Sequence, residues 1–164
     1  MRVRMAGATH LGMRRKNNQD SIYFDEQQGI GIVADGIGGR SGGEIASSMI
    51  VEGLTKAFHD SDKIRHEEVN TFLIAAIDRV NLDIVNRGRV EEANIGMGTT
   101  LNALIFVGDR LHCAHIGDSR TYLFYKDHMW QMTVDHNIET YVERGWLPSS
   151  SMHRCVLKCV ASKH

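Results

Sequence analysis

The chain has 164 residues, a net charge of -1, 42% hydrophobic residues and 24% charged residues. These values are typical of a single soluble domain, and they give no electrostatic reason to expect nucleic acid or an anionic membrane as a partner. The three cysteines do not form the regular framework of a secreted disulfide scaffold, no apolar stretch follows the N-terminal arginines, and the longest apolar run covers only residues 103–107. We therefore expect a cytoplasmic protein that does not enter a membrane.

The first half of the chain begins with two strand-like segments. Residues 21–24 and 30–34 are separated by a turn, which predicts a hairpin whose apolar second strand is buried. Five of the eight residues 36–43 are glycines, so a sharply turning loop is expected there. Ser41 and Glu44 have the spacing of a capping box and predict that a helix follows this loop.

Two helices and then a series of strands are predicted beyond the glycine-rich loop. Apolar residues recur at helical spacing from Ile45 to Phe58 and again over residues 66–87. Cys113 lies in the middle of an apolar run and is expected in the core. The pairs Gly108-Asp109 and Lys126-Asp127 predict the turns of an antiparallel meander. Residues 138–145 are predicted to form a short helix. The strand-like runs are residues 99–107, 111–116, 120–125 and 129–133. This order of elements predicts an α+β layered fold.

Three aspartates lie at the ends of predicted strands and face loops, where a carboxylate can reach a shared cleft without being buried alone. They are Asp20, Asp35 and Asp118. Mg²⁺ and Mn²⁺ prefer oxygen ligands, and Gly36 beside Asp35 allows a backbone carbonyl to approach as a further ligand. The alternative is that each is a solvated turn aspartate, because Asp-Gly is a common turn pair. The glycines lack the pattern of a nucleotide-binding loop, so no organic cofactor is predicted.

Five segments, in the same order and spacing, resemble the motifs of bacterial type 2C protein phosphatases. They are Gly12-Met13-Arg14-Arg15-Lys16-Asn17-Asn18-Gln19-Asp20, Val33-Ala34-Asp35-Gly36-Ile37-Gly38-Gly39, Met97-Gly98-Thr99-Thr100, His115-Ile116-Gly117-Asp118-Ser119-Arg120 and Thr133-Val134-Asp135-His136. The resemblance implies a four-layer sandwich of two antiparallel β-sheets flanked by helices, incomplete at the C-terminus. The resemblance also implies that residues 1–164 form a single partial catalytic domain and that residues 137–155 form a flap-like segment.

The same resemblance assigns roles to individual residues. It implies a centre of two Mn²⁺ or Mg²⁺ ions in which Asp35 bridges the metals, the Gly36 carbonyl binds one of them and Asp20 holds a metal-bound water. Asp118 matches a residue that binds a weaker third metal, and Arg15 matches the arginine that binds the substrate phosphate. The implied activity is hydrolysis of phosphoserine and phosphothreonine on proteins by a metal-activated water, and the implied partners are substrates of serine/threonine kinases.

The sequence departs from the family pattern near the glycine-rich loop. Arg40 stands where many bacterial relatives have histidine, and Ile37 stands where animal members have a histidine proposed as the general acid. The general acid is therefore unassigned, with His10, His115 and His136 as candidates by composition, although a histidine beside a strand is more often structural. Arg40 is an alternative contact for acidic or phosphorylated substrates.

The C-terminal part departs further. The family's Ser-Asp-Gly segment and closing Asp-Asn pair, each of which supplies an aspartate to the metal centre, have no counterpart in the sequence. A fragment, a natural truncation and a chain completed by a partner all fit this pattern. It also leaves a second functional hypothesis, a catalytically impaired module that binds phosphoproteins. A zinc site is a third reading of the C-terminal segment and uses His153, Cys155, Cys159 and His164.

Overall fold

The computed structural model describes residues 2–38, 42–61, 64–91 and 95–147. Several predictions fall outside these ranges. They concern the cap at Ser41, the role of Arg40, the zinc reading of residues 153–164, and the part of the flap-like segment beyond residue 147.

The main sheet has five strands and is antiparallel throughout. Its strands are β1 (Asp20–Asp25), β2 (Ile30–Ile37), β3 (Gly98–Thr99), β4 (Leu101–Val107) and β5 (Arg110–Ile116). The order across the sheet is β1-β2-β4-β5, and β3 pairs with the end of β2. The predicted hairpin is confirmed as β1–β2.

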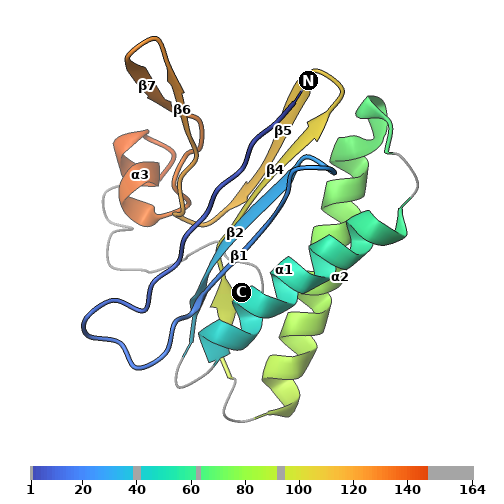
Figure 1. Cartoon of the computed structure of the whole chain (residues 1–164). Helices are drawn as coiled ribbons and strands as arrows, with labels where there is room; N and C mark the ends of the chain where they lie inside the picture. The colour runs from blue at the N-terminus through green and yellow to red at the C-terminus, as the bar shows by residue number, and fades with distance from the viewer. Residues whose placement is uncertain (1, 39–41, 62–63, 92–94, 148–164) are drawn as a thin grey trace.

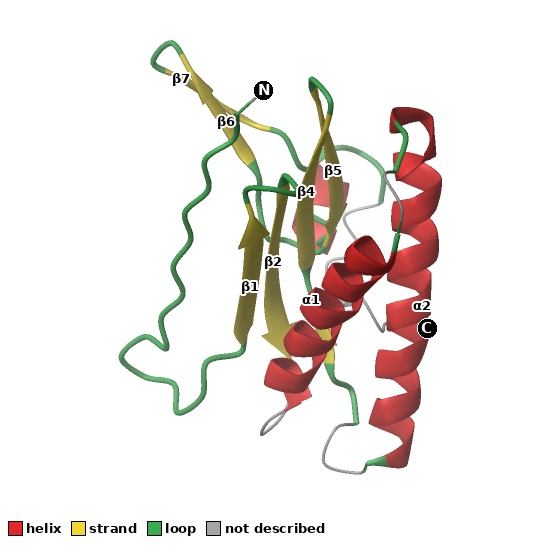
Figure 2. Cartoon of the chain, turned by 45° about the vertical axis from the view of Figure 1, so that its right-hand side comes forward, coloured by secondary structure: helices red, strands yellow, loops and turns green. Residues whose placement is uncertain are grey.

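Two long helices, α1 (Gly42–Asp60) and α2 (Val69–Val90), lie together on one side of this sheet (Figures 1 and 2). A single 3₁₀ turn, η1 (His66–Glu68), leads into α2, so both predicted helices are confirmed. Their inner faces and the strands form the core, in which the largest fully buried side chains include Ile32, Ile50, Leu54, Ile84 and Leu101. No helix within the described ranges is long and apolar enough to span a membrane.

The opposite face of the sheet is only partly covered. The N-terminal segment runs along it (Figure 1), and residues 3–8 line a groove together with side chains of β1, β2 and β4. Phe24, Val33 and Leu111 remain 43–49% exposed. The face without helices is therefore apolar and accessible in the described part of the chain.

Cys113 lies on this accessible face and is exposed, so the prediction of a core cysteine is wrong. Side chains alternate along a strand, and the neighbouring His112 points to the helix side, where it contacts His66 of η1. Cys113 therefore points away from the helices. The apolar run around it carried no alternation that would have separated the two faces.

The predicted single meander is also wrong, because the last two strands leave the main sheet. β6 (Tyr122–Tyr125) and β7 (His128–Gln131) pair only with each other and form a separate hairpin (Figure 2). Gly117, with φ of +103°, turns the chain away after β5. The predicted turns are confirmed, and the short helix α3 (Ile138–Glu143) follows, capped by the Asn137 side chain, which accepts the Thr140 N–H at 2.8 Å. The α+β class with antiparallel sheets is thus confirmed.

Candidate metal centre

Asp20 and Asp35 face each other directly across the β1–β2 hairpin. The Asp35 N–H donates to Thr100 Oγ1 at 3.0 Å, and the Asp35 carbonyl accepts the Thr100 N–H at 2.9 Å. Both backbone groups of Asp35 therefore point away from β1, which makes Asp20 and Asp35 a non-hydrogen-bonded pair. In such pairs the Cα atoms are about 4.5 Å apart and the side chains lie close together. The hairpin thus sets two carboxylates side by side at the end of the sheet.

Gly36 fits this end of the sheet because no side chain can be placed there. A Cβ at position 36 would overlap the Gly43 carbonyl and would lie 2.8 Å from the Gln19 carbonyl oxygen. The Gly36 N–H donates to the same Gln19 carbonyl at 3.0 Å. The strand carrying Asp35 is therefore held tightly between the start of α1 and the segment before Asp20.

The pKa of Asp35 depends on its burial and on the charged side chains around it. Desolvation by burial is the main cause that raises the pKa of Asp35, followed by the negative charge of Asp20 and its hydrogen bond; Asp118 raises it further, and Arg15 lowers it. The Asp35 carboxyl group is nevertheless accessible to solvent. The charges of Asp20, Asp118 and Arg15, the other residues selected from the sequence, therefore all act on the Asp35 carboxyl group.

Arg15 is exposed on the loop before β1, and a glutamine links this loop to the glycine-rich segment. Arg15 Nη1 donates to Gln19 Oε1 at 3.4 Å, and Gln19 Nε2 donates to the Gly38 carbonyl at 3.3 Å. The Gln19 side chain also lies against Gly43, where a Cβ would approach it to 2.8 Å. No role was predicted for Gln19, because its partners in the glycine-rich segment are distant from it in the chain.

Asp118 is exposed on the turn after β5, and the residues on both sides of it are held by hydrogen bonds. The His136 N–H donates to the Gly117 carbonyl at 2.7 Å, and the Gly117 N–H donates to His136 Nδ1 at 3.2 Å. On the other side, Ser119 Oγ lies 2.6 Å from Thr100 Oγ1. The turn therefore presents the Asp118 carboxylate on a fixed backbone.

The three candidate histidines have structural contacts. His10 Nδ1 accepts the Gly12 N–H at 2.9 Å in the N-terminal segment. His115 lies between Asn102 Oδ1, at 2.6 Å, and the Val134 carbonyl, at 3.1 Å. The rings of His115 and His136 lie 4.7 Å apart. These contacts fit positioning of the backbone around Asp118, and none assigns the general acid.

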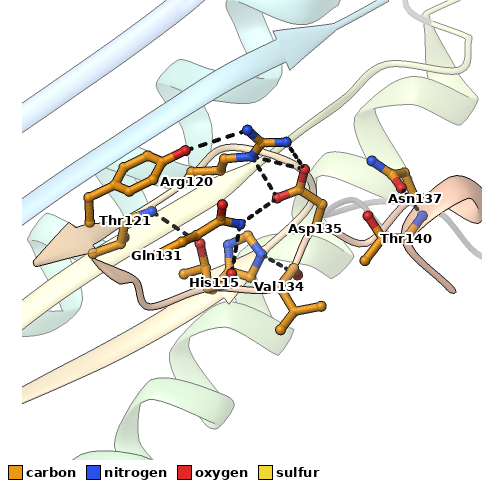
Figure 3. Close-up of polar contacts among 10 residues, drawn as sticks. His115, Arg120, Thr121, Gln131, Val134, Asp135, Asn137 and Thr140 are labelled. Carbon is orange, nitrogen blue, oxygen red and sulfur yellow. Dashed lines mark hydrogen bonds and ion pairs between the residues drawn. The ribbon is translucent and has the colours of Figure 1, made fainter. Parts of the chain in front are cut away.

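An ion pair joins the half-exposed Arg120 to the buried Asp135 (Figure 3). Arg120 Nε donates to both Asp135 carboxylate oxygens at 2.9 and 3.0 Å, and Arg120 Nη2 donates to Asp135 Oδ2 at 2.6 Å. Gln131 Nε2 also donates to this carboxylate at 3.2 Å. Because Asp135 is only 4% exposed, these bonds are needed to offset the loss of water around its charge.

Replacing Asp135 with asparagine is expected to lower the free energy of unfolding at pH 7 by about 1–3 kcal/mol, because it removes charged hydrogen bonds from a buried site. The Arg120 hydrogen bonds hold the pKa of Asp135 below its ordinary value of 3.8. This stabilisation is therefore fully present above the unfolded-state pKa and is lost as the pH falls through the lower folded-state pKa. Urea unfolding at pH 7 and at stepwise lower pH measures it.

The exposed turn residue Asp127 supplies the control, because asparagine also tolerates its φ of +62°. Asp127→Asn should leave the stability at pH 7 nearly unchanged. Equal losses in the two variants would contradict a specific role of the Arg120–Asp135 pair.

The carboxylate oxygens of this site are the donor atoms that hard divalent cations prefer. Two facing carboxylates repel each other, and a cation between them removes that cost. Among the residues that the structure describes, however, no three His, Cys, Asp or Glu side chains form a metal-binding group. Among the described residues, Asp20 and Asp35, beside a glycine-lined backbone, are therefore candidate ligands for such a cation.

Sequence comparison places these features in a known family. The family described as protein phosphatase 2C matches residues 6–149. The serine/threonine protein phosphatase PstP of Mycobacterium tuberculosis is 35% identical over 152 residues, which cover 92% of this chain and 29% of the relative. The serine/threonine phosphatase stp of Listeria innocua is 39% identical over 134 residues, which cover 79% of this chain and 53% of the relative. The chain thus spans between about a third and half of these relatives.

Solved structures agree with this assignment. The S. agalactiae serine/threonine phosphatase matches with a TM-score of 0.82 and 31% identity, covering 96% of this chain and 68% of the neighbour. The PstP catalytic domain in complex with two manganese ions matches with a TM-score of 0.77 and 32% identity, covering 93% of this chain and 64% of the neighbour. The predicted type 2C fold is confirmed, and the chain belongs to the protein phosphatase 2C family.

Proposed function

We propose that this chain provides the N-terminal part of the catalytic centre of a metal-dependent protein serine/threonine phosphatase. The observation that carries the proposal is the direct pairing of Asp20 with Asp35 across β1 and β2, beside Arg15. The related PstP catalytic domain is a complex with two manganese ions, which supports a divalent-metal function for this chain.

In this proposal Asp35 and the Gly36 carbonyl would hold two Mn²⁺ or Mg²⁺ ions, with Asp35 shared between them, and Asp20 would hold a bound water. Asp118 would contribute to a weaker third site. When bound, the cations supply an activated water and neutralise charge that develops on the phosphate. The protein's own contribution is to hold the carboxylates at one end of the sheet, where their mutual repulsion favours cation binding.

Arg15 is proposed to bind the substrate phosphate. Its planar guanidinium presents parallel N–H donors that match two phosphate oxygens, whereas a lysine offers only a compact point charge. The Arg15 side chain is exposed, its hydrogen bond to Gln19 Oε1 is long at 3.4 Å, and its charge acts on the Asp35 carboxyl group. The substrate phosphate would therefore lie between a cationic side chain and the metal-binding carboxylates.

The substrates are proposed to be phosphoserine and phosphothreonine proteins that serine/threonine kinases modify, in cytoplasmic signalling. The net charge of -1 favours neither nucleic acid nor an anionic membrane. Residues 1–164 are taken as part of one catalytic domain, and residues 137–155 as its flap-like segment.

A second candidate function is phosphoprotein binding without hydrolysis. It is favoured by the lack of any group of three potential ligand side chains among the described residues. Two carboxylates provide little charge to retain two divalent cations, whereas Arg15 alone is able to contact a phosphate. A phosphatase-like binding module is therefore the main alternative to an active enzyme.

Hydrolysis of a phosphothreonine peptide in 2 to 10 mM Mn²⁺, about the range in which weak carboxylate sites fill, distinguishes the two functions. The enzyme proposal expects phosphate release by the native chain above that of Asp35→Ala. Equal release, together with saturable binding of the peptide, would support the binding module instead.

Arg15→Lys is expected to lower kcat/KM for this peptide about tenfold, because the lysine cannot form a two-point contact with the phosphate. The neighbouring Arg14 gives a matched control, since Arg14→Lys makes the same chemical change one residue away. Competition by inorganic phosphate should weaken in the Arg15 variant alone. Equal effects of the two substitutions would contradict the assignment of Arg15.

A further inference from the structure

Thr100 lies between β3 and β4, at the point where the pairing of β2 is interrupted. β2 pairs with β4 only through Ile30–Val33, and its pairing with β3 begins at Gly36, which lies opposite Thr99. In the gap, the Thr100 hydroxyl accepts the Asp35 N–H and the Thr100 N–H donates to the Asp35 carbonyl. A side-chain hydroxyl therefore takes the place of a backbone acceptor beside Asp35.

The same hydroxyl reaches the second acidic segment. Thr100 Oγ1 lies 2.6 Å from Ser119 Oγ, and Ser119 directly follows Asp118. The Thr100 methyl group packs against the residue on the other side, because a Cβ added at Gly117 would lie 2.7 Å from Thr100 Cγ2. Thr100 thus contacts both neighbours of Asp118 and the backbone of Asp35.

Burial protects the hydrogen bonds of Thr100 from competition by water. Thr100 is only 5% exposed, so water does not readily replace its partners. Its hydroxyl accepts one hydrogen bond from Asp35 and has one proton of its own, which is available for Ser119. The other described hydrogen bonds of the Asp118 turn join Gly117 to His136 and Arg120 to Asp135, and these partners do not belong to β2. The Thr100 hydroxyl therefore joins the Asp118 turn directly to the strand of Asp35.

We propose that Thr100 is a positioning residue that fixes the Asp118 carboxylate relative to Asp35 through its hydroxyl bridge to Ser119. This proposal rests on the metal-dependent function proposed above, because the position of Asp118 relative to Asp35 matters only if these residues bind metal. It assigns to the Met97–Thr100 motif a role in joining the two acidic segments. In this role Thr100 acts through the backbone of Asp35 and through Ser119, and not as a metal ligand.

Two substitutions at position 100 separate the hydroxyl from the side-chain shape. Thr100→Val keeps the branched shape and removes both hydroxyl contacts, whereas Thr100→Ser keeps the hydroxyl and removes the methyl group. Ser119→Ala removes only the contact between the two segments and is the second test if the valine variant fails to fold.

The first measurement is amide hydrogen exchange of the metal-free chain. Thr100→Val should speed exchange at Asp35 and at residues 117–119 about tenfold or more, and Thr100→Ser should not. Ser119→Ala should speed exchange at residues 117–119 while the Asp35 amide stays protected. Unchanged exchange at residues 117–119 in both Thr100→Val and Ser119→Ala would overturn the proposal.

The second measurement is Mn²⁺ affinity by calorimetric titration. Loss of a residue that orients ligands typically weakens metal binding 10- to 100-fold, so Thr100→Val and Ser119→Ala should both bind Mn²⁺ about tenfold more weakly. Thr100→Ser should remain within about twofold of the native chain. Native affinity in Thr100→Val would overturn the positioning role even if the exchange rates change. Failure of the native chain to bind Mn²⁺ would instead contradict the proposed function, and the exchange data would then decide the hydroxyl bridge alone.

Discussion

Gly36→Ala is expected to lower the free energy of unfolding by about 3 kcal/mol or more, enough to unfold a large fraction of a marginally stable chain. The added methyl group would overlap the Gly43 carbonyl at the start of α1. Backbone atoms, unlike the end of a flexible side chain, cannot move aside without shifting the helix or the strand. Urea unfolding followed by circular dichroism measures the loss.

Gly31→Ala is the matched control, because it makes the same change in the same strand. The nearest atom to a Cβ at position 31 is Met5 Sδ at 4.0 Å, which is ordinary van der Waals contact. This variant should be as stable as the native chain or slightly more stable, since alanine restricts the unfolded chain. Similar stability of the Gly36 and Gly31 variants would show that the contact between β2 and α1 is looser than described.

Asp35→Asn is expected to have opposite effects on the metal-free chain and on metal binding. Burial and the charge of Asp20 raise the pKa of Asp35, so its ionised form opposes folding at neutral pH. Removing that charge should stabilise the metal-free chain by up to about 1 kcal/mol, a small gain because exposed charges are screened. The same substitution removes the proposed bridging carboxylate and should weaken Mn²⁺ binding more than about 100-fold, beyond the usual effect of outer-shell residues.

Thermal unfolding with and without Mn²⁺ measures both effects. With so few carboxylates we expect a native Kd on the order of 1 mM, which corresponds to about 1.4 kcal/mol of stabilisation at 10 mM Mn²⁺. Asp35→Asn should lose this stabilisation, whereas Asp109→Asn, in the turn between β4 and β5, should retain it. Retention of the Mn²⁺ effect in the Asp35 variant would contradict the assigned ligand.

The pairing of Asp20 with Asp35 can be predicted from the sequence. Once the turn places Asp25 opposite Ile30, the register of the hairpin sets residue 20 opposite residue 35. The family motifs supplied the same residues independently, together with Arg15 and Asp118. Local pattern was sufficient here because the two strands are neighbours in the chain.

The errors arose where the outcome depended on distant segments. The strand around Cys113 carries apolar residues and a histidine, His112 or His115, on each face, so its sequence did not indicate which side the helices cover. The departure of β6 from the main sheet depends on Gly117, whose positive φ is accommodated against Thr100. Likewise, nothing local to Thr100 indicated that its hydroxyl would reach Ser119, 19 residues further along the chain.

The most direct test of the central claim is to locate Mn²⁺ by its paramagnetic effect on the NMR spectrum of the chain. At substoichiometric Mn²⁺, the amide signals of Asp20, Asp35 and Gly36 should broaden first, because nuclei nearest the ion relax fastest. The signal of Asp109 should remain sharp until far more metal is added. Broadening that begins elsewhere, or uniform broadening that leaves the Asp20–Asp35 end of the sheet no more affected than the Asp109 turn, would contradict a metal centre built on these two carboxylates.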